Sequence, residues 1–417
     1  MKNTNRYDLS DRLIHFFREV DTESKDYVTF PENWGFDHLA EENIYNPFFL
    51  LRAAIRHNKI FATWSIRNNY RTIYGNRPAI CFTEMPLAAF LETSYKREKL
   101  GQAISSYGLS FLKSELFKLG ARPVIYGLSS NDLNVKNTKK NERIIDQSVL
   151  PMLEQYRYVT YNPSSTRKID WTHEREWRYP YNESIVEFEK ELEEFGIVSE
   201  VEDFPGLEIL EQGISDIGVI VKTKSEAELI LCDILAIFDR NNYSPFRFIF
   251  YTEQIEKIKS ILEPSQEEKE IIKSTIDLSI YITPNKKRDD KIYKQFTSLV
   301  KEVENNYQKP EQGELGGCWL WIYDSLSDLA RALINNERVE LNKEGKYLCF
   351  PYEFSDSRSL SQREDMTKKL AEKIKNTFGV DCGYYSVLNS DNYNELPFYC
   401  SQDYDKYEDR LINKLKN

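Results

Sequence analysis

Short apolar runs recur through the first part of the chain and predict strands. The runs are LIHFF (13–17), PAICFT (78–83), RPVIYGL (122–128) and EWRYPY (176–181). Two stretches with apolar residues at helical spacing, NPFFLLRAAIRHN (46–58) and SFLKSELFKLG (110–120), predict helices between them. Residues 129–148 are polar and turn-rich and predict a loop or lid. We therefore expect a first domain of mixed strands and helices over residues 1–182.

A second periodic region follows in residues 183–263. There the strand-like run 214–222 leads into a helix-like stretch at 224–238, and the run 246–252 is again strand-like. Strand, helix and strand in this order predict a βαβ crossover in an accessory domain. Residues 187–203 are rich in glutamate and predict an acidic connector or a solvated helix.

A third region, residues 293–417, follows a charged stretch, 264–292, that we interpret as a linker. Its clearest element is a helix that opens with the capping box Ser361–Glu364 and ends at Gly379. The apolar residues at helical spacing within it are Met366, Leu370, Ile374 and Phe378. The strand-like runs KYLCFPY and DCGYYSVL flank this helix. We expect a small C-terminal α+β domain, and an α+β class for the chain as a whole.

Composition adds the cellular context. The 417 residues are 41% hydrophobic and 29% charged, as is usual for globular proteins. The first residues contain no apolar signal region, and no run has the length of a membrane helix. Six cysteines are scattered without a CxxC pair, which argues against a disulfide framework and a zinc site. We expect a cytoplasmic protein with reduced thiols, no bound metal and no membrane partner.

The net charge of −11 hides an asymmetry between the two parts of the chain. Residues 1–180 hold 26 Lys and Arg against 21 Asp and Glu, so the remainder carries a net −16. No acid lies between Glu42 and Glu84, and the cations of that window are Arg52, Arg56, Lys59, Arg67, Arg71 and Arg77. Two interpretations stay open: an anion site, such as one for a pyrophosphate or a nucleic-acid backbone, or a basic surface facing the acidic part of the molecule.

The segment WTHEREWRYP (171–180) carries the candidate chemistry. Strand alternation would place Glu174, Glu176 and Arg178 on one face. Two hypotheses account for these glutamates: a solvated edge strand, in which Glu176 is the structural partner of a neighbouring arginine, or a catalytic carboxylate.

Residues 1–182 resemble the diphtheria-toxin/PARP-like ADP-ribosyltransferases in the order of their motifs. In that superfamily a triad of His, Tyr and Glu lies on three strands of a split sheet. Here LIHFF offers His15, the strand Ala79–Thr83 takes the middle position with Tyr74-Gly75 as the upstream turn, and HEREW offers Glu176. The fold implied by the resemblance is a split-sheet catalytic domain followed by two smaller α/β units.

The resemblance implies NAD as substrate and a role for each matched residue. Glu176 would stabilise the positive charge that builds on the ribose as nicotinamide departs. Glu174 would orient or deprotonate the acceptor, and His15 would hold the adenosine-side ribose. The remaining cofactor-binding candidates are Arg52, Arg67 and Arg71 for the pyrophosphate, and Tyr74, Phe82 and Thr83 around the nicotinamide. Cys81 stands where the superfamily has its stacking Tyr, so Phe82 or Tyr74 would supply the ring. A lone histidine in an apolar strand is also typical of a hydrogen-bonded core residue.

A second resemblance is to bacterial abortive-infection proteins of the AbiGi type, which are associated with phage defence. It rests on CFTEMPL (81–87), on Tyr107-Gly108 with Lys113, on GARPVIY (120–126) and on EREWR (174–178). These similarities predict an NAD-dependent mono-ADP-ribosyltransferase toxin whose acceptor is nucleic acid, RNA before DNA, or a protein side chain. An antitoxin or chaperone partner fits such a toxin.

Three alternative functions remain at this point. The same site could hydrolyse NAD, with water as acceptor. A metal-dependent nuclease would need clustered acids with a nearby lysine, which HEREW lacks. A sensor or antitoxin without catalytic activity would use the two C-terminal units to bind a phage product.

Overall fold

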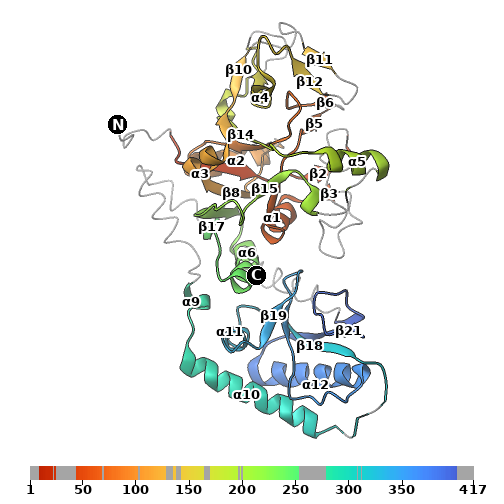
Figure 1. Cartoon of the computed structure of the whole chain (residues 1–417). Coiled ribbons are helices and arrows are strands. Elements are labelled where there is room, and N and C mark those ends of the chain that lie inside the picture. Colours follow the sequence, from red (N-terminus) through yellow and green to blue (C-terminus); the bar gives the residue numbers. More distant parts are fainter. Residues whose placement is uncertain are drawn as a thin grey trace. The chain divides into compact units, whose positions relative to one another are not determined.

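The computed structural model describes most of the chain in two compact units. The described residues are 9–21, 23–24, 44–67, 70–101, 104–127, 135–137, 142–163, 170–195, 198, 201–252, 279–307, 309–310 and 312–401. Unit 1 comprises residues 1–227 and 245–275, and unit 2 comprises residues 228–244 and 276–417. Helices and strands mix in both units, so the expected α+β class is confirmed (Figure 1).

Unit 1 is organised around a seven-stranded sheet. Its strands, in spatial order, are β17 (Phe246–Tyr251), β16 (Ile217–Val221), β8 (Gly108–Leu112), β1 (Arg12–Phe16), β7 (Ala79–Thr83), β14 (Glu176–Pro180) and β9 (Arg122–Pro123). Strands β16 and β17 are parallel, and every other neighbouring pair is antiparallel. The strands predicted from LIHFF, PAICFT and EWRYPY are therefore confirmed as β1, β7 and β14.

The predicted βαβ crossover is also confirmed, but it lies in the same sheet as the first domain. Helix α6 (Lys224–Asn241) connects β16 to the parallel β17. Strand β16 pairs with β8, where Val219 lies opposite Leu109. The boundary expected at residue 182 thus falls inside one sheet, and the compact units divide within α6 instead.

Helices cover the sheet of unit 1. Helix α1 (Pro47–Arg56) begins at Asn46, whose side chain accepts a hydrogen bond from the Phe49 amide at 2.8 Å. The remaining helices are α2 (Leu87–Lys99), which follows Pro86, α3 (Lys113–Leu119), α4 (Met152–Gln155) and α5 (Val186–Phe195). One apolar core joins Ile14 of β1 to Phe90 of α2 and Phe248 of β17.

Smaller elements surround this sheet. The paired strands are β2 (Val20–Asp21) with β3 (Ile44–Tyr45), β4 (Lys59–Phe61) with β15 (Gly206–Glu208), β5 (Ile66–Arg67) with β6 (Tyr70–Arg71), β10 (Ile125–Gly127) with β13 (Tyr158–Thr160), and β11 (Val135–Asn137) with β12 (Arg143–Ile145). Two 3-10 turns are η2 (Thr172–Glu174) and η3 (Val201–Asp203). The loop expected at 129–148 therefore contains two paired strands, because Val135 and Ile145 pack with buried Tyr74 and Tyr158.

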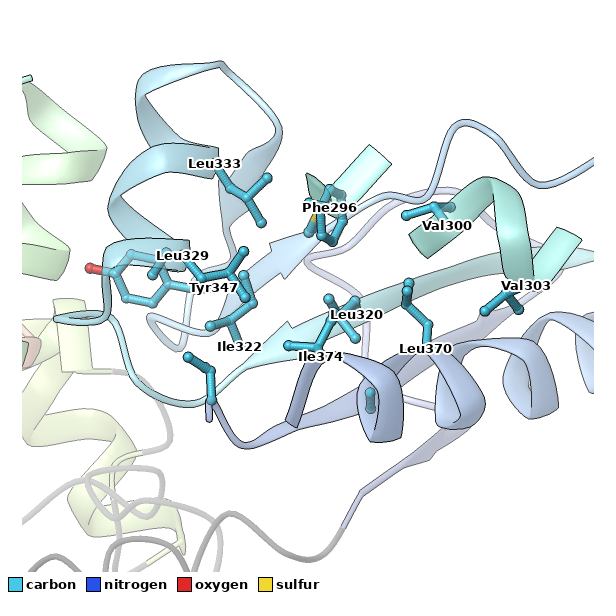
Figure 2. Packing of buried hydrophobic residues seen from close by; sticks show 14 of the residues in the cluster. Phe296, Val300, Val303, Leu320, Ile322, Leu329, Leu333, Tyr347, Leu370 and Ile374 are labelled. Carbon is cyan, nitrogen blue, oxygen red and sulfur yellow. The ribbon is translucent and has the colours of Figure 1, made fainter. Parts of the chain in front are cut away.

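Unit 2 has a five-stranded antiparallel sheet with helices on one face. The strand order is β19 (Val339–Leu341), β20 (Tyr347–Cys349), β18 (Gly316–Ile322), β21 (Cys382–Leu388) and β22 (Tyr399–Cys400). The helices are residues 228–241 of α6, followed by α9 (Ser279–Ile282), α10 (Lys286–Asn305), α11 (Asp328–Asn335) and α12 (Leu360–Phe378). Figure 2 shows Phe296 of α10, Leu333 of α11 and Leu370 of α12 converging on Leu320 of β18.

The ends of two unit 2 helices differ from the sequence-based expectations. Helix α12 begins after Ser359, whose hydroxyl accepts from the Gln362 amide, so the cap lies two residues before the expected Ser361. Gly379 ends the helix in the left-handed conformation, at φ 72°, as predicted. Helix α10 begins at Lys286, inside the stretch interpreted as a linker, because Phe296, Val300 and Val303 give it a buried apolar face.

Candidate functional site

The three strands that carry the candidate triad lie side by side. Strand β7 is hydrogen-bonded to β1 on one side and to β14 on the other. Thr83 of β7 lies opposite Ile14 of β1 and opposite Glu176 of β14. The three matched motifs therefore lie on three neighbouring strands, although 93 positions separate Thr83 from Glu176 along the chain.

The register places His15 and Glu176 on opposite faces of the sheet. Residues paired across antiparallel strands project to the same face, so Ile14, Thr83 and Glu176 share one face. His15 projects to the other face, where its ring lies 4.8 Å from that of Phe17 and 5.8 Å from that of Phe82. The arrangement differs from the single His–Glu site that the resemblance implies, because adjacent residues of a strand alternate between faces.

A buried arginine holds the Glu176 carboxylate. Its Oε1 accepts a hydrogen bond from Arg178 Nε at 2.7 Å, and the two side chains are 18% and 7% exposed. Cys81 lies opposite Arg178 on the neighbouring strand. Burial first, and then the nearby Glu176 carboxylate, together raise the pKa of the Cys81 thiol to about 12. The thiol is therefore a neutral neighbour of this ion pair, and Glu176 keeps a partly exposed carboxylate in a fixed place.

Glu174 does not share a strand with Glu176. It lies in the turn η2, and Arg175 follows in the left-handed conformation at φ 45°, so β14 begins only at Glu176. The Glu174 carboxylate accepts from Arg97 Nη1 at 2.9 Å and lies 3.2 Å from His173 Nε2. The expected shared face is thus wrong, because the turn at Arg175 interrupts the strand alternation. The Glu174–Arg97 pair instead ties the turn to α2.

Two aromatic residues, Trp171 and Tyr126, lie beside this turn. Trp171 is 44% exposed, and its ring lies 6.2 Å from that of His173. The Tyr126 hydroxyl donates to the Trp171 carbonyl at 3.0 Å. Burial raises the pKa of Tyr126 to about 12, with a further contribution from Glu176. Tyr126 therefore stays neutral and connects Trp171 to the neighbourhood of Glu176.

His15 is a neutral residue in a largely apolar layer. Its Nδ1 lies 2.9 Å from the Cys81 carbonyl oxygen. Because a carbonyl only accepts, Nδ1 carries the hydrogen and Nε2 has a free lone pair. Burial is the main cause that lowers the pKa of His15 to about 4; the Cys81 carbonyl opposes this change, and Arg18 adds to it. The contacts match the alternative of a hydrogen-bonded core histidine.

The aromatic residues expected to stack on nicotinamide are themselves core residues. Tyr74 is 2% exposed, and its hydroxyl accepts from Arg143 Nη1 at 3.3 Å. Phe82 is also 2% exposed and packs edge-on against Phe111. Thr83 is buried and donates its hydroxyl hydrogen to the Glu174 carbonyl at 2.6 Å. In this conformation none of the three offers a free face to a ligand ring.

Of the three arginines expected to bind pyrophosphate, Arg52 and Arg71 make other contacts within unit 1. The Arg52 side chain is buried in α1 and lies over the Phe48 ring at 5.8 Å. Arg71 stacks over Trp64 at 3.8 Å and pairs with Glu142 and Glu189 at 3.7 and 3.9 Å. The side chain of Arg67 lies outside the described residues. The contacts of Arg52 and Arg71 thus hold unit 1 together, which weakens the interpretation of the acid-free window as an anion site.

A second carboxylate, which the sequence did not single out, lies at the end of β7. Glu84 accepts from Lys113 Nζ at 2.8 Å and from the indole nitrogen of Trp177 at 2.7 Å. Its side chain is 18% exposed, as is that of Glu176. These three residues come from CFTEMPL, from the end of SFLK and from EREWR, three of the motifs that carry the abortive-infection resemblance. The signal in the sequence that could have identified Glu84 is that it and its two partners all lie in these motifs.

Unit 2 contains a hollow of about 290 Å³ between α12 and β21. Its charged lining consists of Lys368, Glu372, Lys375 and Asp381. Lys375 pairs with Asp381 at 2.6 Å, and Lys368 lies over the Tyr384 ring at 4.6 Å. Because the charges balance, the lining favours neither an anion nor a cation.

Comparisons with known proteins bear only on unit 2. A family model described as "Protein of unknown function (DUF4427)" matches residues 286–410. No curated protein matches the chain. No solved structure matches it. Within the described residues, no group of His, Cys, Asp and Glu side chains could hold a metal ion, and no helix is long and apolar enough to cross a membrane.

Proposed function

We propose that the chain cleaves NAD between nicotinamide and ribose and transfers the ADP-ribose, with Glu176 as the carboxylate that faces the ribose. The observation that carries this proposal is the strand order: β1, β7 and β14, which hold the three matched motifs, are neighbours, and Glu176 lies in register with Thr83. An ion pair and a partly exposed position suit a group that must stay charged and reach a ligand.

The proposed chemistry needs one well-placed negative charge. As the C1′–nitrogen bond breaks, its electron pair leaves with nicotinamide and positive charge develops on the ribose. The Glu176 carboxylate stabilises that charge more strongly than it stabilises the bound substrate, which is what lowers the barrier. An acceptor oxygen or nitrogen then bonds to C1′ and gives up its proton, for which Glu174 is the nearest candidate base in sequence.

The proposal assigns fewer residues than the resemblance does. His15 projects to the face opposite Glu176, and Tyr74 and Phe82 are enclosed in the core. We therefore propose that the groups contacting nicotinamide and adenosine lie on the same face of the sheet as Glu176. Roles for His15 and the acid-free window in NAD binding stay predictions.

RNA is the acceptor we propose first, with a protein side chain second, because residues 1–180 carry an excess of five positive charges. The abortive-infection resemblance supports a role as a phage-defence toxin in the cytoplasm, with an antitoxin or chaperone as partner. A sensor without catalytic activity remains the alternative if no NAD is consumed.

The experiment follows label from adenylate-labelled NAD incubated with the full chain and cell lysate. Label that RNase removes identifies an RNA acceptor, label that protease removes identifies a protein, and free ADP-ribose identifies a hydrolase. The Glu176→Gln variant should lose activity by about 100-fold or more. Glu304→Gln in unit 2 is the matched control, since Glu304 is about as exposed as Glu176 and is also paired with a buried arginine, Arg358. Equal activity of Glu176→Gln and the unchanged chain would contradict the proposal.

A further inference from the structure

The Arg178 guanidinium connects two parts of unit 1. Its Nε donates to Glu176 Oε1 at 2.7 Å, and its Nη1 donates to the Tyr156 carbonyl at 2.6 Å and, more weakly, to the Tyr158 carbonyl at 3.4 Å. The side chain is 7% exposed. One planar group therefore fixes the carboxylate of Glu176 against the main chain of another segment.

That other segment, residues 142–163, has a buried set of internal hydrogen bonds. It contains β12, α4 and β13, and Gln155 holds it together from a fully buried position. The Gln155 side chain accepts from the Ile145 amide at 2.9 Å and donates to the carbonyls of Ile145 and Leu150 at 2.6 and 3.0 Å. The carbonyls that Arg178 binds therefore belong to a segment with hydrogen bonds of its own, in addition to the packing of Tyr156 against Ala79 of β7.

We propose that Arg178 is the positioning residue for Glu176. It holds the carboxylate in place by binding it and the main chain of the 142–163 segment at the same time. This inference rests on the proposed function, since Glu176 is the group positioned. The rigid fork of an arginine fits both acceptors at once, whereas a lysine has a point charge on a flexible stem and fits only one of them. A small displacement of a reacting group lowers the rate without preventing substrate binding.

A purely structural arginine would give a different result from a positioning one. Loss of a structural contact lowers the amount of folded protein and leaves the folded fraction fully active. Loss of positioning lowers kcat in protein that is still folded and still binds NAD with the same KM. The split between kcat and KM therefore separates the two roles.

The test is Arg178→Lys in the full chain, assayed by NAD consumption. We expect kcat to fall by about 10- to 100-fold while KM for NAD changes by less than about twofold. Arg12→Lys is the matched control, because Arg12 is also buried in the central sheet but bonds Ser110 and Asp216 instead. Arg12→Lys should keep the kcat of the unchanged chain. Unchanged kcat in Arg178→Lys would overturn the inference.

A second variant acts at a distance and covers the case in which Arg178→Lys does not fold. Gln155→Ala loosens the 142–163 segment without altering Glu176 or Arg178, so kcat should again fall with KM retained. Unchanged kcat in Gln155→Ala would show that the segment does not position the carboxylate. If Glu176→Gln is as active as the unchanged chain, the proposed function fails first. If only Glu176→Gln is inactive, the function stands and the inference is overturned.

Discussion

The lowered pKa of His15 gives a prediction about the stability of unit 1 that does not depend on the reaction. Burial lowers the pKa of His15 to about 4, whereas an unfolded histidine titrates near 6.5. As the pH falls below about 6.5, the unfolded chain takes up a proton that the folded chain refuses. Unit 1 therefore loses stability between about pH 6.5 and 4, and above that window His15 has no effect.

The size of the effect follows from the two titrations. Between pH 7.5 and pH 5.0 the difference amounts to about 2 kcal/mol, at about 1.4 kcal/mol for each pH unit between the two pKa values. The His15 ring is half-buried, so we take this as an upper figure. In His15→Gln the amide can still donate to the Cys81 carbonyl, but no titrating group remains at this position.

The assay is urea unfolding of the unchanged chain and of His15→Gln at both pH values. Because the chain has two compact units, hydrogen exchange of the β7 amides should identify the transition of unit 1. The unchanged chain should lose about 2 kcal/mol more than the variant on going to pH 5.0. Equal losses in the two proteins would refute the assignment of a buried, neutral His15, as would titration of His15 near its ordinary pKa.

Two further predictions test the packing of each unit. In unit 1, a Cβ at Gly218 would meet the Phe248 ring 2.0 Å away, so Gly218→Ala should destabilise the unit by about 1–3 kcal/mol in urea unfolding. Adding Phe248→Leu should recover part of that loss, and no recovery would contradict the close approach of β16 and β17. In unit 2, Asp239 and Arg331 form an ion pair at 2.6 Å with side chains only 4% exposed, so Asp239→Asn should cost about 3–5 kcal/mol. The double variant Asp239→Leu with Arg331→Met should unfold at higher urea than Asp239→Asn, and the opposite order would argue against a buried pair.

Elements bounded by clear local signals could be predicted from the sequence. Strand β7 ends before Met85-Pro86, and α12 has both a serine cap and the terminal Gly379. Strand β8 was missed because its last residue, Leu112, runs directly into α3 at Lys113 with no turn residue between them. The apolar spacing of SFLKSELF suited a helix throughout, and only pairing with β1 and β16 makes its first part a strand.

For the candidate site, the motif order predicted three strands, one for each member of the triad, but not which strands are neighbours. The face on which a side chain lies is fixed by the register between strands, which no local pattern records. Pairing of Ile14 with Thr83, one position from His15, is what directs His15 away from Glu176. Arg178 donates to the carbonyls of Tyr156 and Tyr158, 22 and 20 residues earlier in the chain, and no local pattern predicts that contact.

The most direct test of the central proposal is the release of nicotinamide, measured by chromatography for the unchanged chain, Glu176→Gln and the control Glu304→Gln in the presence of lysate. We predict release by the unchanged chain and by Glu304→Gln, and a rate lower by about 100-fold or more for Glu176→Gln. Release by Glu176→Gln at the rate of the unchanged chain, or no release by any of the three, would contradict the proposal.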